Sequence, residues 1–237
     1  MWTRPRVWSW GVVCGVAVLC GCAAPHIDLP LLPTFPPSAT QSIFWEERFD
    51  QLGTDQWREV EVHGHTSYAA VTLDGRACLK AHSQAAASIL LHQAQFNPRT
   101  HEWLSWDWRV EKLVPGEALD RKDGSDAAAR LYVYFETTGL PWQKRNIDYV
   151  WSATLPVGTI LDSAFSSASK IIVVESGADS VGQWRRVQRN LTDDYTRCFG
   201  EDPPDVIAIG VMTDADNTRG EALAYYDDLS IRKTRKE

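Results

Sequence analysis

The stretch ARLYVYFE, residues 129–136, alternates between two kinds of side chain. Successive side chains of a β-strand point to opposite faces of a sheet. The alternation sets Ala129, Leu131, Val133 and Phe135 against Arg130, Tyr132, Tyr134 and Glu136. One apolar face and one aromatic, ionic face are typical of a strand that covers a core on one side only. The stretch therefore predicts a sheet whose second face is free to meet a ligand.

A second stretch, LSWDWRV at 104–110, repeats this pattern. Over 102–110 the alternation sets Leu104, Trp106, Trp108 and Val110 against Trp103, Ser105, Asp107 and Arg109. Two further runs, 170–174 and 206–211, are apolar on both faces, which predicts central strands. Gly210 lies inside the second run, and a glycine in mid-strand often lets another group approach the backbone closely.

Most of the chain after residue 40 consists of short runs rich in Val, Ile, Tyr, Phe and Trp, bounded by Gly, Asp, Asn or Pro. The predicted strands are 43–49, 57–63, 77–82, 86–93, 101–110, 129–137, 147–155, 170–175, 183–189, 205–213 and 223–232. This spacing predicts an all-β sandwich or barrel. One short helix is expected near 190–199, capped by Asn190 or Thr192 and ended by Gly200. The charged segment 115–126 is expected to be a solvent loop.

The chain has 237 residues, with 31 acidic against 24 basic side chains and a formal net charge of −7. This balance argues against a sequence-independent nucleic-acid binder, which needs a basic surface. The sequence contains no Walker loop, no G-x-G-x-x-G, no C-x-x-C and no G-x-S-x-G. Nucleotide-binding, redox and serine-hydrolase functions therefore lack support.

The N-terminal segment has the pattern of a targeting signal. Two arginines precede an apolar run, 7–20, that is too short to span a bilayer as a helix. The LCGC that ends at Cys22 resembles a bacterial lipobox, which implies that residues 1–21 are a signal peptide and that Cys22 is acylated. Ala23 resembles the residue that directs lipoproteins to an outer membrane, so we expect a lipid-anchored protein of the cell envelope facing the periplasm. The alternative is a plain secretory signal or a short uncleaved anchor.

Five prolines within 23–40 predict an extended spacer. We therefore expect a Pro-rich tether over 22–40 and a single β-sandwich domain over 41–237. The alternative is that this segment packs on the domain through its leucines and Phe35.

Cys78 and Cys198 are the cysteines that remain once residues 1–21 are removed and Cys22 is lipidated. In an oxidising envelope they could form a disulfide. The alternative is two separate buried thiols.

Six stretches together carry a family resemblance. They are LSWDWRV at 104–110, DAAARLYVYFE at 126–136, DYVWS at 148–152, GQWRRVQRNLTDDYTRCFGEDPP at 182–204, IAIGVMTDADNT at 207–218 and AYYDDLSI at 224–231. Taken as a set, over residues 43–232, they resemble a family of bacterial envelope proteins catalogued as domain of unknown function 3047. The resemblance implies no established activity.

Two acids interrupt the apolar face of the first and last predicted strands. Glu47 lies among Ile43, Trp45 and Phe49, and Asp227 among Leu223, Tyr225, Leu229 and Ile231. WEERFD at 45–50 together with YYDDLSI more distantly resembles the galactose-binding-like jelly rolls of carbohydrate-binding modules. That resemblance implies a jelly-roll β-sandwich in which the first and last strands lie together and Glu47 and Asp227 hold a structural Ca²⁺. The alternative is that both acids lie near strand ends that open to solvent.

The ligand hypothesis follows from the aromatic and polar residues on the free faces. A saccharide or envelope glycan would stack on rings and accept hydrogen bonds from polar tips beside them. The candidate stacking residues, which could also belong to the core, are Trp103, Tyr132, Tyr134, Tyr149 and Trp151. Asp107 and Arg130 would bind hydroxyls, and Asp214, Asp216 and Asn217 would close the end. The loop TDADNTRG at 213–220 is not an EF-hand because Arg219 stands where Gly is required. Three alternatives stay open for this loop: it binds sugar, it binds a cation, or it simply forms Asx-turns.

Two other functions stay open. A glycoside hydrolase or lyase would need two carboxylates at a set separation, and the candidates are Glu136, Asp148, Glu175, Asp214 and Asp216. A structural lipoprotein would instead dock an envelope protein partner on a flat apolar patch.

Overall fold

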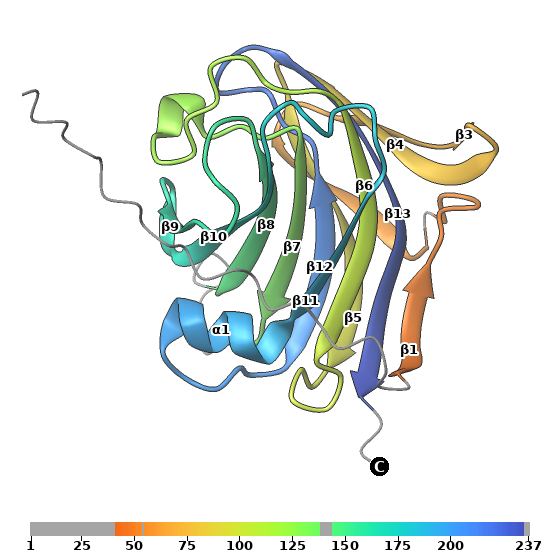
Figure 1. Cartoon of the computed structure of the whole chain (residues 1–237), viewed down its shortest axis with the longest axis vertical. Coiled ribbons are helices and arrows are strands. Elements are labelled where there is room, and N and C mark those ends of the chain that lie inside the picture. Colours follow the sequence, from red (N-terminus) through yellow and green to blue (C-terminus); the bar gives the residue numbers. More distant parts are fainter. Residues whose placement is uncertain (1–40, 54, 138–143, 235–237) are drawn as a thin grey trace, which may run out of the picture. The chain divides into compact units, whose positions relative to one another are not determined.

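The structure is a computed structural model that describes residues 41–53, 55–137 and 144–234 (Figure 1). The predicted signal peptide, the lipidation site Cys22 and the tether lie outside the described residues. Within these ranges no helix has the length and apolar character needed to cross a membrane.

Two sheets carry the fold. Sheet A has the strand order β11-β6-β13-β4-β3, with β1 also paired to β13. Its strands are β1 (Gln41–Glu47), β3 (Ser67–Leu73), β4 (Arg76–Gln84), β6 (Trp103–Lys112), β11 (Arg185–Asn190) and β13 (Glu221–Thr234). Sheet B has the order β2-β5-β12-β7-β8-β10-β9. Its strands are β2 (Trp57–His63), β5 (Ala87–Phe96), β7 (Ala129–Phe135), β8 (Asn146–Ser152), β9 (Ile160–Ser163), β10 (Ser166–Ser176) and β12 (Val206–Met212).

The arrangement is a jelly-roll β-sandwich, as predicted. The chain passes repeatedly between the two sheets, and the first strand pairs with the last, with Glu47 opposite Leu229. Each of the eleven predicted runs overlaps a strand, whereas β3 and β9 are additional. The runs that are apolar on both faces correspond to β10 and β12, and β12 lies in the interior of sheet B between β5 and β7.

The main core lies between the inner faces of the sheets. Its largest side chains, none of them exposed to solvent, are Trp106, Trp108, Tyr149 and Trp151. The rings of Trp106 and Trp108 meet edge to face at 5.4 Å between centroids, a favourable geometry for aromatic pairs. The predicted alternation of β6 and of β7 is confirmed, because their apolar residues all lie in this core.

The alternation expected for the last strand is wrong up to Asp227, where Leu223 and Tyr225 do not face the core, and right after it, where Leu229 and Ile231 do. Asp228 has a positive φ of 49°, and the pairing of β13 with β6 shifts register between Asp227 and Ser230. A bulge of this kind inserts one residue and exchanges the faces of the strand beyond it. Ala222, Ala224 and Tyr226 therefore face the core before the bulge and Leu229 and Ile231 after it. Asp227 lies on the outer face of sheet A, not among the core residues.

The segment predicted as a solvent loop packs instead against the outer face of sheet B. It contains the 3-10 helix η1 (Lys122–Gly124). A second, smaller core joins this segment to β8 and β10 through Leu119, Ala127, Val150, Ile171 and Val173. The segment therefore covers one part of this face and forms a wall beside the part left open.

The predicted helix is confirmed as α1 (Leu191–Phe199). The Asn190 side chain accepts hydrogen bonds from Thr192 N and Asp193 N, and Gly200 ends the helix at a φ of 75°. The helix lies at the end of the sandwich opposite η1 (Figure 1). Cys78 is buried and Cys198 is half-buried. Both are free thiols, so the structure has the separate thiols and not the disulfide.

Candidate ligand-binding site

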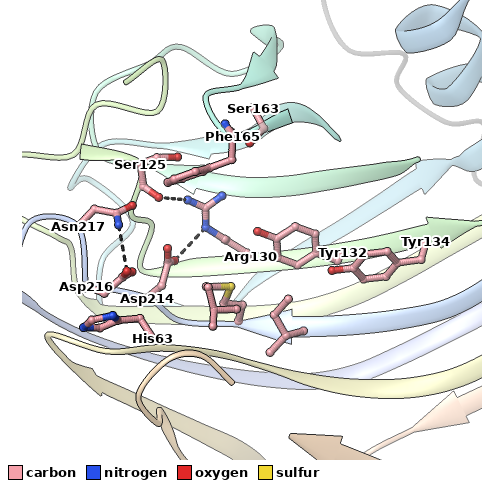
Figure 2. Close-up of a pocket in the computed structure, with 13 residues that line it drawn as sticks. His63, Ser125, Arg130, Tyr132, Tyr134, Ser163, Phe165, Asp214, Asp216 and Asn217 are labelled. Atoms are coloured by element: carbon pink, nitrogen blue, oxygen red, sulfur yellow. Dashed lines mark hydrogen bonds and ion pairs between the residues drawn. The ribbon is translucent and has the colours of Figure 1, made fainter. Parts of the chain in front are cut away.

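A pocket of about 320 Å³ lies on the open part of the outer face of sheet B (Figure 2). Strands β2, β5, β7 and β12 form its floor, and the β9–β10 hairpin and two loops form its walls. The lining residues are Val62, His63, Ile89, Ser125, Arg130, Tyr132, Tyr134, Ser163, Phe165, Met212, Asp214, Asp216 and Asn217.

Strand β7 places a row of three side chains along the floor, because every second residue points outward. Tyr132 and Tyr134 are half-buried, and their ring centroids lie 5.8 Å apart with 19° between the planes. Figure 2 shows the two rings in line with Arg130. Burial, and then the negative charge of Asp148, raises the pKa of both phenols, so both hydroxyls stay neutral and able to donate hydrogen bonds.

Arg130 anchors the polar end of this row. It is only 3% exposed, and its Nε donates to Asp214 Oδ1 at 2.9 Å while Nη2 donates to the Ser125 carbonyl at 2.8 Å. Nη1 pairs with Asp148. Burial alone would lower the pKa of Arg130, but the two carboxylates outweigh it and raise that pKa well above its ordinary value. The guanidinium is thus a permanent positive charge. It links β7 to β8, to the loop that contains Ser125 and to the loop that contains Asp214.

Three carboxylates gather beside Arg130. Asp126, Asp214 and Asp216 each offer an oxygen, and these atoms all lie within 4.8 Å of one another. Burial raises the pKa of Asp214 to about 7, with Asp126 adding to the shift and Arg130 opposing it. Burial and the charge of Asp126 also raise the pKa of Asp216. Carboxylates are ligands that Ca²⁺ prefers, and such a group also suits hydrogen-bonding to a ligand that enters the pocket.

The structure brings together one part of the predicted ligand set. Arg130, Tyr132, Tyr134, Asp214, Asp216 and Asn217 all line the pocket. Tyr149 and Trp151 do not reach it, since they lie wholly buried in the core. Their strand, β8, turns its odd-numbered residues inward.

Trp103 and Asp107 belong to β6, in the other sheet, and lie away from the pocket. The Asp107 carboxylate accepts hydrogen bonds from Arg76 at 2.7 Å and from Arg186 at 3.1 Å. The aromatic and ionic outer face predicted for this strand exists, but it is the outer face of sheet A. The sequence did not indicate which strands share a sheet.

Glu47 and Asp227, the predicted Ca²⁺ ligands, each have donors from the protein. Glu47 accepts hydrogen bonds from Phe49 N at 2.8 Å and from Trp57 Nε1 at 2.9 Å. Asp227 pairs with Arg76 on the outer face of sheet A. Both oxygens of Glu47 have protein donors, whereas Asp227 Oδ1 is buried without a hydrogen-bond partner among the described residues, and a structural Ca²⁺ at this pair stays a prediction.

Several pocket residues were not predicted as part of a ligand site. Ser163 and Phe165 come from the β9–β10 hairpin, and no strand was predicted from the sequence at β9. Met212 could have been found, because the alternation of its strand puts it on the same face as Gly210. A Cβ on Gly210 would meet Ile89 Cγ2 at 2.8 Å, so the group that approaches this glycine is a side chain of the neighbouring strand.

Comparisons with known proteins identify one family. Comparison with curated proteins finds no match. A family 11 carbohydrate-binding module of a cellulosomal cellulase of Clostridium thermocellum is 7% identical with a TM-score of 0.45, over 84% of this chain and 98% of that chain. A mannan-recognising carbohydrate-binding module, TmCBM27, is 13% identical with a TM-score of 0.39, over 83% and 100%. A family 11 xylanase from Neocallimastix patriciarum is 9% identical with a TM-score of 0.35, over 81% and 96%. A family model described as "Protein of unknown function (DUF3047)" matches residues 55–230, and the chain therefore belongs to this family.

Proposed function

We propose that the chain is a non-catalytic binding domain that takes a saccharide in the pocket on the outer face of sheet B. The observation that carries the proposal is the pair of half-buried rings, Tyr132 and Tyr134, on the pocket floor. Aromatic faces pack against the apolar faces of sugar rings, and each phenol places a polar tip beside that contact.

The polar end of the pocket supports the same function. Asp214, Asp216 and Asn217 lie beside Arg130 (Figure 2). The two carboxylates supply acceptors for sugar hydroxyls, and the Asn217 amide supplies a donor. The volume of about 320 Å³ lies at the lower end of the range for small-molecule pockets. An apolar floor with a few converging polar groups is the usual composition of such sites.

The binding test uses a glycan array probed with the purified full chain and with two variants. Tyr132→Ala removes a ring from the pocket floor, and we expect it to abolish specific signals. Trp103→Ala removes a ring from the outer face of sheet A, and we expect it to retain them. Circular dichroism establishes that both variants are folded. An array without signals for the folded protein, or equal loss in both variants, would contradict the proposal.

Glycoside cleavage is the second candidate, and one observation favours it. Asp214 has a pKa raised to about 7 and lies close to Asp216 in the pocket, as a general acid lies beside its partner carboxylate. Against it, Asp214 Oδ1 already accepts from Arg130 and from Ala127 N. Release of new reducing ends from an array ligand, lost in Asp216→Asn, would replace the binding function with this one.

The envelope anchor belongs to the same proposal. Acylation of Cys22 would hold the domain at a membrane surface, because added acyl chains strengthen an otherwise marginal attachment. Expression of the natural chain and of Cys22→Ala, each with metabolic lipid labelling and membrane fractionation, tests it. We expect label and membrane association in the natural chain only, and equal fractionation of the two would refute the anchor.

A further inference from the structure

We infer that the saccharide taken by this pocket carries a positively charged amino group, which sits against Asp214 and Asp216. The inference rests on the proposed function, because it names the class of sugar that the same pocket binds. An amino sugar with a free amine fits it, and the N-acetylated or neutral counterpart does not.

The charge at this end of the pocket is unbalanced. Arg130 is the guanidinium that lines it, and its donors are already shared between Asp148, Asp214 and the Ser125 carbonyl. Asp216 lines the pocket as well, and its Oδ2 accepts from a neutral group, Asn217 Nδ2, at 3.0 Å.

Asp126 adds a further negative charge from behind the lining. Its two oxygens accept from Asn217 N at 3.1 Å and Thr218 N at 2.7 Å. Four carboxylates therefore lie in this region with one guanidinium, which pairs with two of them, and with the Lys122 ammonium 5.8 Å from the ring centroid of Phe165. His63, which is exposed and lines the same end, contributes a positive charge only when protonated. A cationic group on the ligand would reduce the imbalance, and a neutral one would not.

Asp214 supplies the second, independent observation. This side chain is only 3% exposed. Its Oδ1 accepts from Ala127 N at 3.0 Å and Arg130 Nε at 2.9 Å, whereas its Oδ2 accepts no hydrogen bond from any residue that the structure describes. This oxygen is not one of the fully buried polar atoms that lack a partner, so it is open to a donor from a ligand in the pocket that Asp214 lines. Figure 2 shows this carboxylate beside Asp216, and both residues line the pocket.

An ammonium group meets these requirements better than a hydroxyl does. It offers three donors and no acceptor, so one group can donate to both carboxylates at once. Hydrogen bonds between ionised partners are roughly twice as strong as those between neutral groups. The sugar ring that bears the amine would then rest on Tyr132, the next side chain along β7.

The experiment measures the affinity of the purified full chain, treated with EDTA, by isothermal titration calorimetry. The probes are a β-1,4-linked glucosamine tetramer, its fully N-acetylated counterpart, a β-1,4-glucose tetramer and hexane-1,6-diamine. We expect the glucosamine tetramer to bind at least about tenfold more tightly than the N-acetylated one, with a preference that falls as salt is added.

Two variants locate the amine. Asp216→Asn is used because Asp216 is half-buried and carries no ion pair, whereas Asp214 pairs with Arg130. We expect Asp216→Asn to reduce the preference for the glucosamine tetramer over the N-acetylated one to below about threefold. Asp193→Asn removes one exposed carboxylate at the start of α1 and should keep the full preference.

The outcomes separate this inference from the proposed function. Equal binding of charged and neutral tetramers overturns the inference and leaves the saccharide site standing. Binding of the diamine without any tetramer supports amine recognition and overturns the saccharide function. No binding of any probe overturns the inference for this pocket. A preference seen only before EDTA treatment would show that a metal ion, not an amine, meets these carboxylates, and this too overturns it.

Discussion

Replacement of Arg130 by Met should destabilise the fold by removing the guanidinium that the buried carboxylates of Asp148 and Asp214 share. Asp148 and Asp214 are 1% and 3% exposed, so water cannot take the place of the lost charge. Removing one partner of a buried ion pair costs about 3–5 kcal/mol. For a domain of this size that loss lowers Tm by roughly 2–4 °C per kcal/mol, or about 6–20 °C in all.

The loss should depend on pH in a defined direction. Burial raises the pKa of Asp148 and brings that of Asp214 to about 7, and without Arg130 both values rise further. Both carboxyls therefore become neutral as the pH falls. The difference in free energy of unfolding between the natural chain and the variant is then smaller at pH 5 than at pH 8. Asp148→Asn together with Asp214→Asn in the Arg130→Met background should recover much of the stability.

The assay is urea unfolding, monitored by circular dichroism at both pH values. The m value, which is the slope of the free energy of unfolding against urea concentration, is compared between the proteins. Arg58→Met is the matched control, because Arg58 is exposed on β2, and it should change the free energy of unfolding by less than about 0.5 kcal/mol. A loss below about 1 kcal/mol for Arg130→Met, the same at pH 5 and pH 8, would refute the reasoning.

Three further perturbations test other parts of the structure. Gly210→Ala places a Cβ 2.8 Å from Ile89 Cγ2, so we expect a loss of about 1–3 kcal/mol in urea unfolding, and an unchanged midpoint would contradict the close packing. Asn190→Ala removes the acceptor for two N–H groups of α1 and should cost about 1 kcal/mol, while Asn190→Asp should retain most of the cap; equal stability of all three proteins would be evidence against it. The folded chain holds the proton of Asp214 more tightly than the unfolded chain, with a pKa of about 7 against 3.8, so this group makes the free energy of unfolding fall as pH rises from about 4 to about 7. Asp214→Asn should remove that part of the slope, and a slope that is identical in the variant would refute this origin.

Local alternation predicted the strands of an all-β sandwich or barrel and the centre of the site, because strand parity depends only on neighbours in sequence. The jelly-roll arrangement was implied by the resemblance of the first and last strands to carbohydrate-binding modules. It placed Arg130, Tyr132 and Tyr134 on one face before any partner strand was known. The loop residues Asp214 and Asp216 were found because a dense polar run at a strand end is visible without tertiary information. All five line the pocket.

The errors have a common cause in information that is not local. The bulge at Asp228 exchanges the faces of β13, and a single inserted residue leaves no periodic signal. Trp103 has the alternation of a free face, but only the pairing of strands shows that its face belongs to sheet A. Tyr149 and Trp151 could equally have faced a ligand or a core, and packing of the second sheet determines which.

The pairing of β1 with β13 also determines where a mechanical load on the chain would be felt first. Gln41 lies opposite Thr234 at the end of this antiparallel pair, and β1 pairs with no other described strand. A pull applied at Gln41 away from the sheet would open the pairs one after another from that end, rather than shearing them together. The strands that form the pocket floor belong to sheet B and stay outside this path. Tension at the N-terminal side would therefore unravel β1 while the strands of the pocket floor, in the other sheet, kept their pairing.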